Sequence, residues 1–231
     1  FFNSIVLLIG ADSNFFEIMI ASVDASHEVD DIDLQNFDMF YSYHSDENRV
    51  FENFQPSFRE DKIVFEKVLH QISDTDADIR SVDENFEHVS TLYELGYESG
   101  KHSRFNLDGN FAVRQFKNLY NLWITNSLNR QFADDVLVIY IEEKIAGFAT
   151  YKTNQDIAAI GLIAVMPEFQ GQGLGSKLLQ RIEFLLFEKS INKLQIPTQQ
   201  ANVDACAFYI KKRYTILSTT SITHYWKNDT I

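Results

Sequence analysis

One glycine-rich stretch limits what this 231-residue chain can fold into more than any other feature. Residues 161–177 read GLIAVMPEFQGQGLGSK, an apolar segment that passes through a proline into alternating glycines and then into a leucine-rich segment. Gly171, Gly173 and Gly175 permit positive φ angles and a close approach of the backbone to a ligand. Backbone N–H groups and the positive end of a following helix can then converge on phosphate oxygens. The stretch therefore predicts a strand, a turn and a helix that bind a phosphate or pyrophosphate group.

Two common phosphate-binding motifs do not fit this stretch. A Walker loop places its second glycine before Lys and then Ser or Thr, but Ser176 stands at that glycine and Leu178 follows Lys177. A dinucleotide-binding fingerprint would also need glycine at position 176. The remaining pattern is Gln170-x-x-Gly173-x-Gly175, which resembles the Gln/Arg-x-x-Gly-x-Gly/Ala signature of the GNAT acetyltransferase superfamily.

The resemblance implies that the chain binds acetyl-CoA as its cosubstrate. The pyrophosphate would lie on the glycine turn, and the pantetheine arm would lie along a strand, Leu162 to Val165, that splays from its neighbour. A backbone amide of that strand would polarise the thioester carbonyl. The implied cofactor-binding residues are Ile163, Ala164, Val165, Gln170, Gly171, Gln172, Gly173, Leu174, Gly175, Ser176 and Asn202.

A second pattern typical of the same superfamily lies further along the chain and reads Asn202-x-x-Ala205-x-x-Phe208-Tyr209. The resemblance implies that Asn202 lies beside the cofactor and orients the leaving group. It also implies that Tyr209 is the catalytic general acid, because a tyrosine hydroxyl keeps its proton at neutral pH and can protonate the departing thiolate. A buried tyrosine hydrogen-bonded to backbone is the alternative interpretation. No Glu, Asp or His stands out as the general base.

Three more segments resemble one branch of the superfamily, the dTDP-fucosamine acetyltransferases. They read YESGKHSRFNLD (97–108), LYNLWITNSLNR (119–130) and ADDVLVIY (133–140). The resemblance implies acetyl transfer to the 4-amino group of dTDP-4-amino-4,6-dideoxygalactose, by direct attack and in surface-glycan biosynthesis. The candidate acceptor-binding residues are Arg104, Phe105, Trp123 and Asn126. A salt bridge at Arg104 and helix packing at Trp123 are the alternative interpretations.

Two other functions fit the acetyl-CoA motifs. One is acetylation of a different amine, such as a protein N terminus or an aminoglycoside, which the net charge of −13 would attract. The other is acyl-CoA binding without catalysis, which the presence of both Asn202 and Tyr209 disfavours. The same negative charge repels a phosphate backbone and therefore predicts no nucleic-acid partner.

Cysteine and histidine usage indicates the compartment and the absence of a metal. Cys206 is the only cysteine, so the chain forms no internal disulfide and a cytoplasmic location is expected. The six histidines are scattered without metal-ligand spacing, which predicts no metal site. The apolar residues 1–10 are too few to span a bilayer and predict a strand, so no membrane partner is expected. The family resemblance further implies a homodimer.

The order of apolar patterns predicts an α+β fold: a mixed, mostly antiparallel GNAT sheet flanked by helices, with a smaller N-terminal α/β domain. The polar residues 73–76 suggest a boundary between an N-terminal domain, 1–75, and a GNAT domain, 76–231. Period-two patterns predict strands at 136–141, 145–152, 157–165, 193–197 and 215–226. Helices are predicted at 82–96, at 111–128, after the glycine turn and at 202–212.

Overall fold

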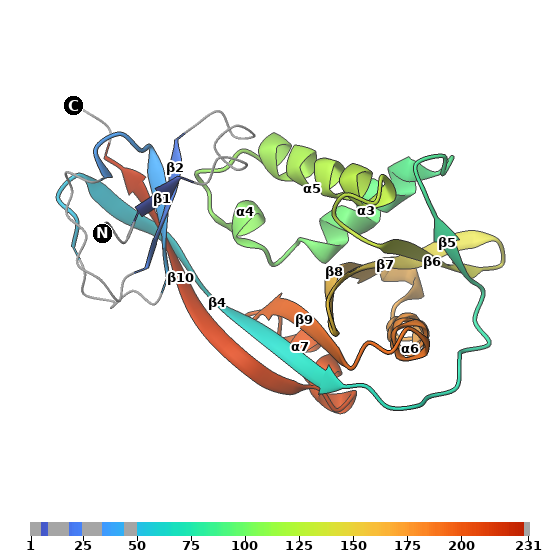
Figure 1. The fold of residues 1–231 in the computed structure, drawn as a ribbon. Coiled ribbons are helices and arrows are strands. Elements are labelled where there is room, and N and C mark those ends of the chain that lie inside the picture. Colours follow the sequence, from blue (N-terminus) through green and yellow to red (C-terminus); the bar gives the residue numbers. More distant parts are fainter. Residues whose placement is uncertain (1–5, 9–18, 25–33, 44–49, 229–231) are drawn as a thin grey trace.

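The computed structural model describes residues 6–8, 19–24, 34–43 and 50–228. Within these ranges the chain forms one ten-stranded sheet, in the order β1-β2-β3-β10-β4-β9-β8-β7-β6-β5 (Figure 1). The strands are β1 (Val6–Leu8), β2 (Ile20–Asp24), β3 (Met39–Tyr43), β4 (Phe54–Val68), β5 (Ile79–Val82), β6 (Asp135–Ile141), β7 (Lys144–Asn154), β8 (Ile157–Val165), β9 (Lys193–Gln199) and β10 (Thr215–Lys227). The helices are α3 (Val89–Ser99), α4 (Arg104–Leu107), α5 (Val113–Leu128), α6 (Leu174–Glu188) and α7 (Val203–Lys211), and a 3₁₀ turn spans Pro167–Phe169.

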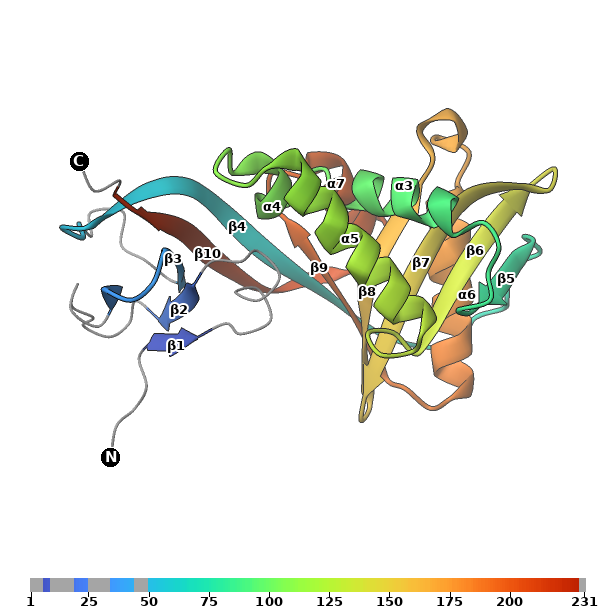
Figure 2. The ribbon, with the colours of Figure 1, turned by 90° about the horizontal axis from the view of Figure 1, so that it is seen from above.

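The sheet is mixed and mostly antiparallel, as the sequence predicts. Among the described strands, only the β2–β3 and β8–β9 pairs are parallel. Helices cover both faces of its central part, because each strand there is apolar on both sides. In β6, Val136 and Val138 pack in the cluster that contains α3 and α5, whereas Leu137 and Ile139 pack in the cluster that contains α6. Figure 2 shows α3 and α5 lying across β6, β7 and β8.

Helix α6 is held by its buried leucine face. Leu178, Leu179, Ile182 and Leu186 recur at helical spacing and are at most 1% exposed. Burying each of these side chains stabilises the fold by about 1.5–3 kcal/mol. This packing fixes the start of the helix, and therefore the glycine turn before it, against the sheet.

The strands β8 and β9 pair only at their first residues. Their parallel register joins Ile157, Ala158 and Ala159 to Lys193, Leu194 and Gln195 and ends there. Beyond that point β8 turns away, because its pairing with β7 contains a bulge opposite Thr150. The hydroxyl of Thr150 accepts a hydrogen bond from the N–H of Leu162 at 2.9 Å and so satisfies a donor that the bulge frees. The two strands therefore enclose a V-shaped opening.

The strands β4 and β10 form a long antiparallel pair that joins the two ends of the sheet. Figure 2 shows this pair running from the helix-covered strands to β1, β2 and β3. At that end Phe40, Phe51, Phe54 and Tyr225 form a small aromatic cluster, with Phe40 stacked on Tyr225 at 4.8 Å. Strand β4 also pairs with β9. The division of the chain at residue 75 stays a prediction, and β4, on its N-terminal side, shares the sheet with the GNAT core.

One predicted helix begins later than expected. The sequence predicts a helix over 82–96, but Val82 closes strand β5, opposite Val136 of β6, and α3 begins only at Val89. Asp83 starts a turn by accepting a hydrogen bond from the N–H of Asn85. This turn separates the end of strand β5 from the start of helix α3. The predicted strand at 1–10 contains β1, and its other residues lie outside the described ranges. None of the described helices is long and apolar enough to cross a membrane.

Candidate active site

The glycine turn ends at the N-terminus of α6 and leaves its backbone donors open. Gly171 and Gly173 have φ angles of +76° and +79°, a conformation that glycine adopts without strain. Nothing lies within 4 Å of where a Cβ would stand on either residue. The backbone N–H groups of residues 171–175 find no acceptor among the described residues. A row of free donors at a helix N-terminus is a site for an anion.

Gln170 fixes this turn to the rest of the molecule. Its Nε2 donates to the carbonyl oxygen of Val165 at 3.0 Å and to Glu98 at 3.2 Å. The first contact ties the turn to the end of β8, and the second ties it to α3. Glu98 also pairs with Lys101 at 2.6 Å. Gln170 thus fastens the turn in this structure, and the glycines beside it leave their N–H groups open.

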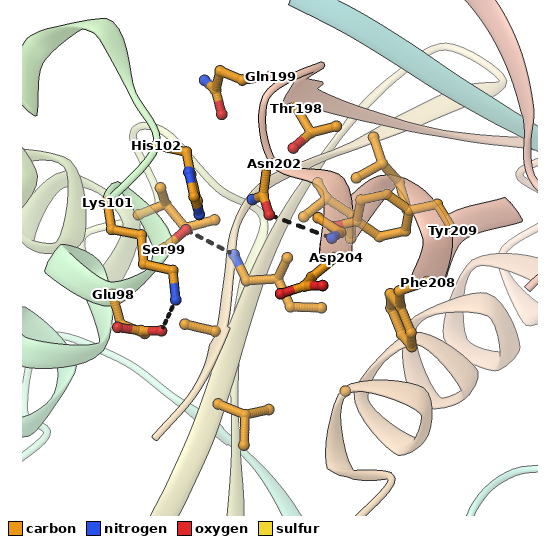
Figure 3. A pocket seen from close by; sticks show the side chains of 18 of the residues that line it. Glu98, Ser99, Lys101, His102, Thr198, Gln199, Asn202, Asp204, Phe208 and Tyr209 are labelled. Atoms are coloured by element: carbon orange, nitrogen blue, oxygen red, sulfur yellow. Dashed lines mark hydrogen bonds and ion pairs between the residues drawn. The ribbon is translucent and has the colours of Figure 1, made fainter. Parts of the chain in front are cut away.

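The V-shaped opening between β8 and β9 is the centre of a cleft of about 710 Å³, which we call the β8–β9 cleft. In Figure 3, Glu98, Ser99, Lys101 and His102 lie on one side of this cleft, and Asn202, Asp204, Phe208 and Tyr209 lie on the other. Strand β8 forms part of its lining through Leu162, Ile163, Ala164 and Val165. The N–H of Ile163 reaches the hydroxyl of Ser99 at 3.4 Å, a long contact that a better acceptor can replace.

Helix α7 brings the second sequence pattern into the cleft. Asn202 precedes the helix, and its Oδ1 accepts a hydrogen bond from the N–H of Ala205 at 3.3 Å, which caps the helix. Tyr209 lies two turns later and is 4% exposed, with its ring against Phe65 of β4. Burial, and to a smaller extent Cys206, raises the pKa of the Tyr209 hydroxyl. The hydroxyl therefore remains protonated at any physiological pH.

The far end of the cleft carries charged side chains that come from separate parts of the chain. Arg104 of α4 lies 3.7 Å from Glu60 of β4, measured between Nη1 and Oε1, and their side chains are 17% and 7% exposed. The guanidinium also stacks over the rings of Tyr41 and Phe105. Lys62 lies near both Arg104 and Glu60, and Lys101 and His102 line the same cleft. We call the part lined by Glu60, Lys62 and Arg104 the acceptor end.

A buried network behind the acceptor end holds α4 in place. Asp108, just after α4, accepts hydrogen bonds from Nδ1 of His224 at 2.6 Å and from Nε1 of Trp226 at 3.0 Å, both on β10. Ser57 of β4 donates to the same carboxylate at 3.0 Å. Burial alone would raise the pKa of Asp108, but the bonds from His224, Trp226 and Asn110 outweigh it and lower the pKa to about 2. One carboxylate therefore connects the segment that carries Arg104 to two strands.

Most of the residues that the sequence predicts to bind the cofactor or the acceptor, or to act in catalysis, line the β8–β9 cleft. These are Ile163, Ala164, Val165, Gln170, Gly171, Gly173, Leu174, Gly175, Ser176, Asn202, Tyr209, Arg104, Phe105 and Trp123. Gln172 is exposed beside the turn, and Asn126 lies one turn beyond Trp123 on α5; neither is among the lining residues. For Arg104 the predicted alternative, a salt bridge with a carboxylate, is also present.

Sequence reasoning missed Glu60 and Lys62, which reach the cleft through the pairing of β4 with β9. No local pattern marks them, because β4 reads as an ordinary alternating strand. The sequence pattern also predicted no role for Lys101 or His102, although both lie in the segment 97–108 that contains the predicted acceptor-binding residue Arg104. In the described part of the chain, no three His, Cys, Asp or Glu side chains gather in a way that could hold a metal ion.

Comparisons with known proteins agree with this geometry. Residues 105–213 match the model of the acetyltransferase (GNAT) family. The chain is 37% identical over 59 residues to the [ribosomal protein bS18]-alanine N-acetyltransferase of Haemophilus influenzae, which covers 26% of this chain and 40% of that protein. The chain spans less than half the length of each of the two curated relatives it matches.

Solved structures share the fold at low sequence identity. A conserved protein of unknown function from Staphylococcus epidermidis superposes with a TM-score of 0.60 at 14% identity, covering 91% of this chain and 85% of that one. The PaiA N-acetyltransferase of Thermoplasma acidophilum, solved with coenzyme A, gives a TM-score of 0.50 at 19% identity, covering 67% and 100%. The chain thus has the GNAT fold, and its match to the acetyltransferase (GNAT) family model covers residues 105–213.

Proposed function

We propose that this protein is an acetyl-CoA-dependent N-acetyltransferase that transfers the acetyl group directly to a primary amine. The observation that carries the proposal is the glycine turn, whose five open N–H groups, from Gly171 to Gly175, lie at the N-terminus of α6, where all of these residues except Gln172 line the β8–β9 cleft. A pyrophosphate would accept from these donors and would be favoured by the helix dipole. The coenzyme A bound to the Thermoplasma relative supports the same ligand here.

The residues of the cleft then take distinct roles. The glycine turn holds the pyrophosphate, and the thioester lies along β8, where the N–H of Ile163 or a neighbouring amide polarises its carbonyl. Tyr209 donates its proton to the sulfur as the C–S bond breaks. Asn202 caps α7 through its Oδ1, which leaves its Nδ2 to orient the leaving group. Holding the reactants in this arrangement removes much of the entropic cost of the reaction.

For the acceptor we propose the primary amine of a nucleotide-linked amino sugar, such as dTDP-4-amino-4,6-dideoxygalactose. In a chain of net charge −13, the cleft is lined by Lys62, Lys101, His102 and Arg104, which suits an acceptor with phosphates. Phe105 and Trp123 line the cleft next to them and offer faces for a sugar or a base. We also propose a cytoplasmic location and a homodimer, which rest on the single cysteine and on the family resemblance.

A protein N-terminal amine is the second candidate acceptor. It is favoured by the relative from Haemophilus influenzae, which is named for acetylating an alanine of ribosomal protein bS18. The acidic surface of this chain would attract a basic ribosomal protein. The two acceptors differ in charge, so they can be separated in one assay.

A thiol-release assay with acetyl-CoA tests both candidates. The acceptors are dTDP-4-amino-4,6-dideoxygalactose, its glucose-configured epimer, a UDP-linked 4-amino sugar, a peptide beginning with alanine, and an aminoglycoside. We expect turnover on a nucleotide-linked sugar. Turnover confined to the peptide or the aminoglycoside would replace the acceptor and keep the acetyltransferase. Tight binding of acetyl-CoA with no turnover on any amine would indicate a binding module instead.

A further inference from the structure

Glu60 is a buried residue at the acceptor end, and one of its carboxylate oxygens has no hydrogen-bond partner among the described residues. Its side chain is 7% exposed and lines the β8–β9 cleft. Oε1 lies 3.7 Å from Nη1 of Arg104, which is a loose pairing. Oε2 is buried and has no hydrogen-bond partner among the described residues, and the same is true of Nε of Arg104. A buried carboxylate oxygen without a partner destabilises the fold, so a ligand that donates to it would remove this penalty.

Glu60 lies in the part of the cleft beside α4 and β10. The β4–β9 pairing ends at Lys62 and Gln199, so Glu60 lies two residues past the end of β9, near the start of α7. The glycine turn lines the same cleft from the N-terminus of α6. An amine bound by Glu60 would therefore approach a thioester lying along β8 from the side opposite the pyrophosphate.

We propose that Glu60 binds the acceptor as a protonated primary amine and removes its proton before attack. This inference rests on the proposed acetyltransferase function and supplies the base that the sequence does not reveal. The amine enters as R–NH₃⁺ and donates to Oε2. One proton passes to Glu60, and the freed nitrogen lone pair forms the C–N bond to the thioester carbonyl carbon. The C–S bond breaks with its electron pair on sulfur.

The protons of this sequence balance. The departing thiolate takes a proton from the Tyr209 hydroxyl, and Tyr209 regains one from the nitrogen, which loses its second proton as it becomes an amide. The proton on Glu60 returns to solvent. The products are the acetylated amine, coenzyme A as a free thiol, and one proton. No oxidant, metal or covalent enzyme intermediate is needed for this balance.

The surroundings of Glu60 suit a proton acceptor. Burial raises the pKa of Glu60 above 4.5 and Asp61 adds to this, while Arg104 and Lys62 act in the opposite direction without reversing it. On α5 the buried hydroxyl of Tyr120 interacts with it, and β10 opposes it with the apolar Ile222. A base whose pKa lies closer to neutrality takes a proton from an amine at a smaller free-energy cost.

The test is the pH dependence of kcat/KM for Glu60→Gln, measured with whichever amine the wild-type protein acetylates. Wild-type kcat/KM should stay level between the raised pKa of Glu60 and the pKa of the amine, because the enzyme uses the protonated form. The variant can use only the neutral amine, so its kcat/KM should fall tenfold for each pH unit below the amine pKa. At pH 7 we expect a loss of about tenfold for each pH unit by which the amine pKa exceeds 7.

The matched control is Glu66→Gln, the same change on the same strand, at a carboxylate that pairs with Lys193 and does not line the cleft. It should keep the wild-type pH profile within about twofold. Thermal melting and acetyl-CoA binding should be near wild type for Glu60→Gln. If that variant fails to fold, Glu60→Asp, which retains the carboxylate, should keep a level profile at a lower rate.

Two results separate this inference from the proposed function. If the wild-type protein releases no thiol with any amine, the acetyltransferase proposal fails and Glu60 has no reaction to serve. If the wild-type protein turns over but Glu60→Gln loses the same factor at every pH, or loses nothing, Glu60 is only a counter-ion of Arg104. Either of these last outcomes would overturn its role as base and leave the acetyltransferase in place.

Discussion

Two buried tyrosines near the end of α7 show how residue type alone does not define a role. Tyr209 and Tyr214 lie 6.1 Å apart between ring centroids, and burial raises the pKa of both hydroxyls. The Tyr214 hydroxyl donates a hydrogen bond to Oε1 of Glu183 at 2.8 Å, inside the core and away from the cleft. Tyr209 lines the cleft, and its hydroxyl makes no hydrogen bond with another described residue. Of the two hydroxyls, only that of Tyr209 belongs to a residue that lines the cleft, which supports the proposed general-acid role.

The change Tyr209→Phe should lower kcat by about 10²-fold or more, because the thiolate must then leave without a proton donor. Acetyl-CoA affinity should be nearly unchanged, since the pyrophosphate is proposed to bind the backbone N–H groups of the glycine turn and not the Tyr209 hydroxyl. Steady-state kinetics and a binding titration measure the two quantities. Tyr214→Phe serves as the control: it should lose about 1–3 kcal/mol of stability and keep its kcat. Wild-type turnover by Tyr209→Phe would remove the general-acid assignment.

At the scale of elements, the strand β8, the glycine turn and α6 act as one unit. Gln170 ties the turn to β8, and buried leucines tie α6 to the sheet. The left-handed Gly173 is the residue at which the chain changes from turn to helix. A left-handed conformation costs a residue other than glycine about 1–2 kcal/mol. The turn therefore depends on glycine for its shape, and a methyl group there would also occupy the space open to a phosphate.

The change Gly173→Ala should therefore raise the dissociation constant of acetyl-CoA by at least about tenfold and lower stability by about 1 kcal/mol. Isothermal titration and urea unfolding measure these effects. Gly109→Ala is the matched control, because a Cβ there also meets nothing within 4 Å and the backbone is not left-handed. That variant should bind acetyl-CoA as the wild type does. Equal affinity in Gly173→Ala would show that the turn does not contact the cofactor.

At the scale of the whole molecule, Asp108 and His224 join the segment that begins with α4 to the long β4–β10 pair. His224 is fully buried, and its Nδ1 contacts Asp108. Burial lowers the pKa of His224 below 6.5; Asp108 acts in the opposite direction, and the nearby Arg104 lowers it further. Between its folded and unfolded pKa values, the unfolded chain binds more protons at this residue than the folded chain. Stability from this site is thus lost as pH falls below 6.5.

The free energy of unfolding should accordingly decrease between pH 7 and pH 5, with His224 contributing at most about 1.4 kcal/mol per pH unit. Asp108 adds a further loss only at lower pH, as its carboxylate becomes protonated between 3.8 and about 2. Urea unfolding at a series of pH values measures the slope. The slope should be shallower in His224→Gln and unchanged in the control His88→Gln, at an exposed histidine. An unchanged slope in His224→Gln would contradict this account.

Much of the fold follows from local patterns. The leucine spacing of α6, the alternation in β6 and β7, and the capping asparagine before α7 all depend on residues a few positions apart, and each element forms where the sequence predicts it. The helix predicted at 111–128 begins at Val113, after a start at which Gln115 accepts a hydrogen bond from the N–H of Ala112. The one clear displacement, at Val82, arose because pairing with β6 outweighed the helical pattern.

The sequence by itself determined the glycine turn and the asparagine–tyrosine helix, since turn and cap geometry depend on neighbouring residues and on the special freedom of glycine. Only the tertiary structure decided that these two patterns share one cleft with Glu60 and Arg104. That arrangement needs β4 to pair with β9, more than a hundred residues away, and β8 to bulge away from β9. Contacts between such distant segments are selected by the packing of the whole sheet, and no local pattern encodes them.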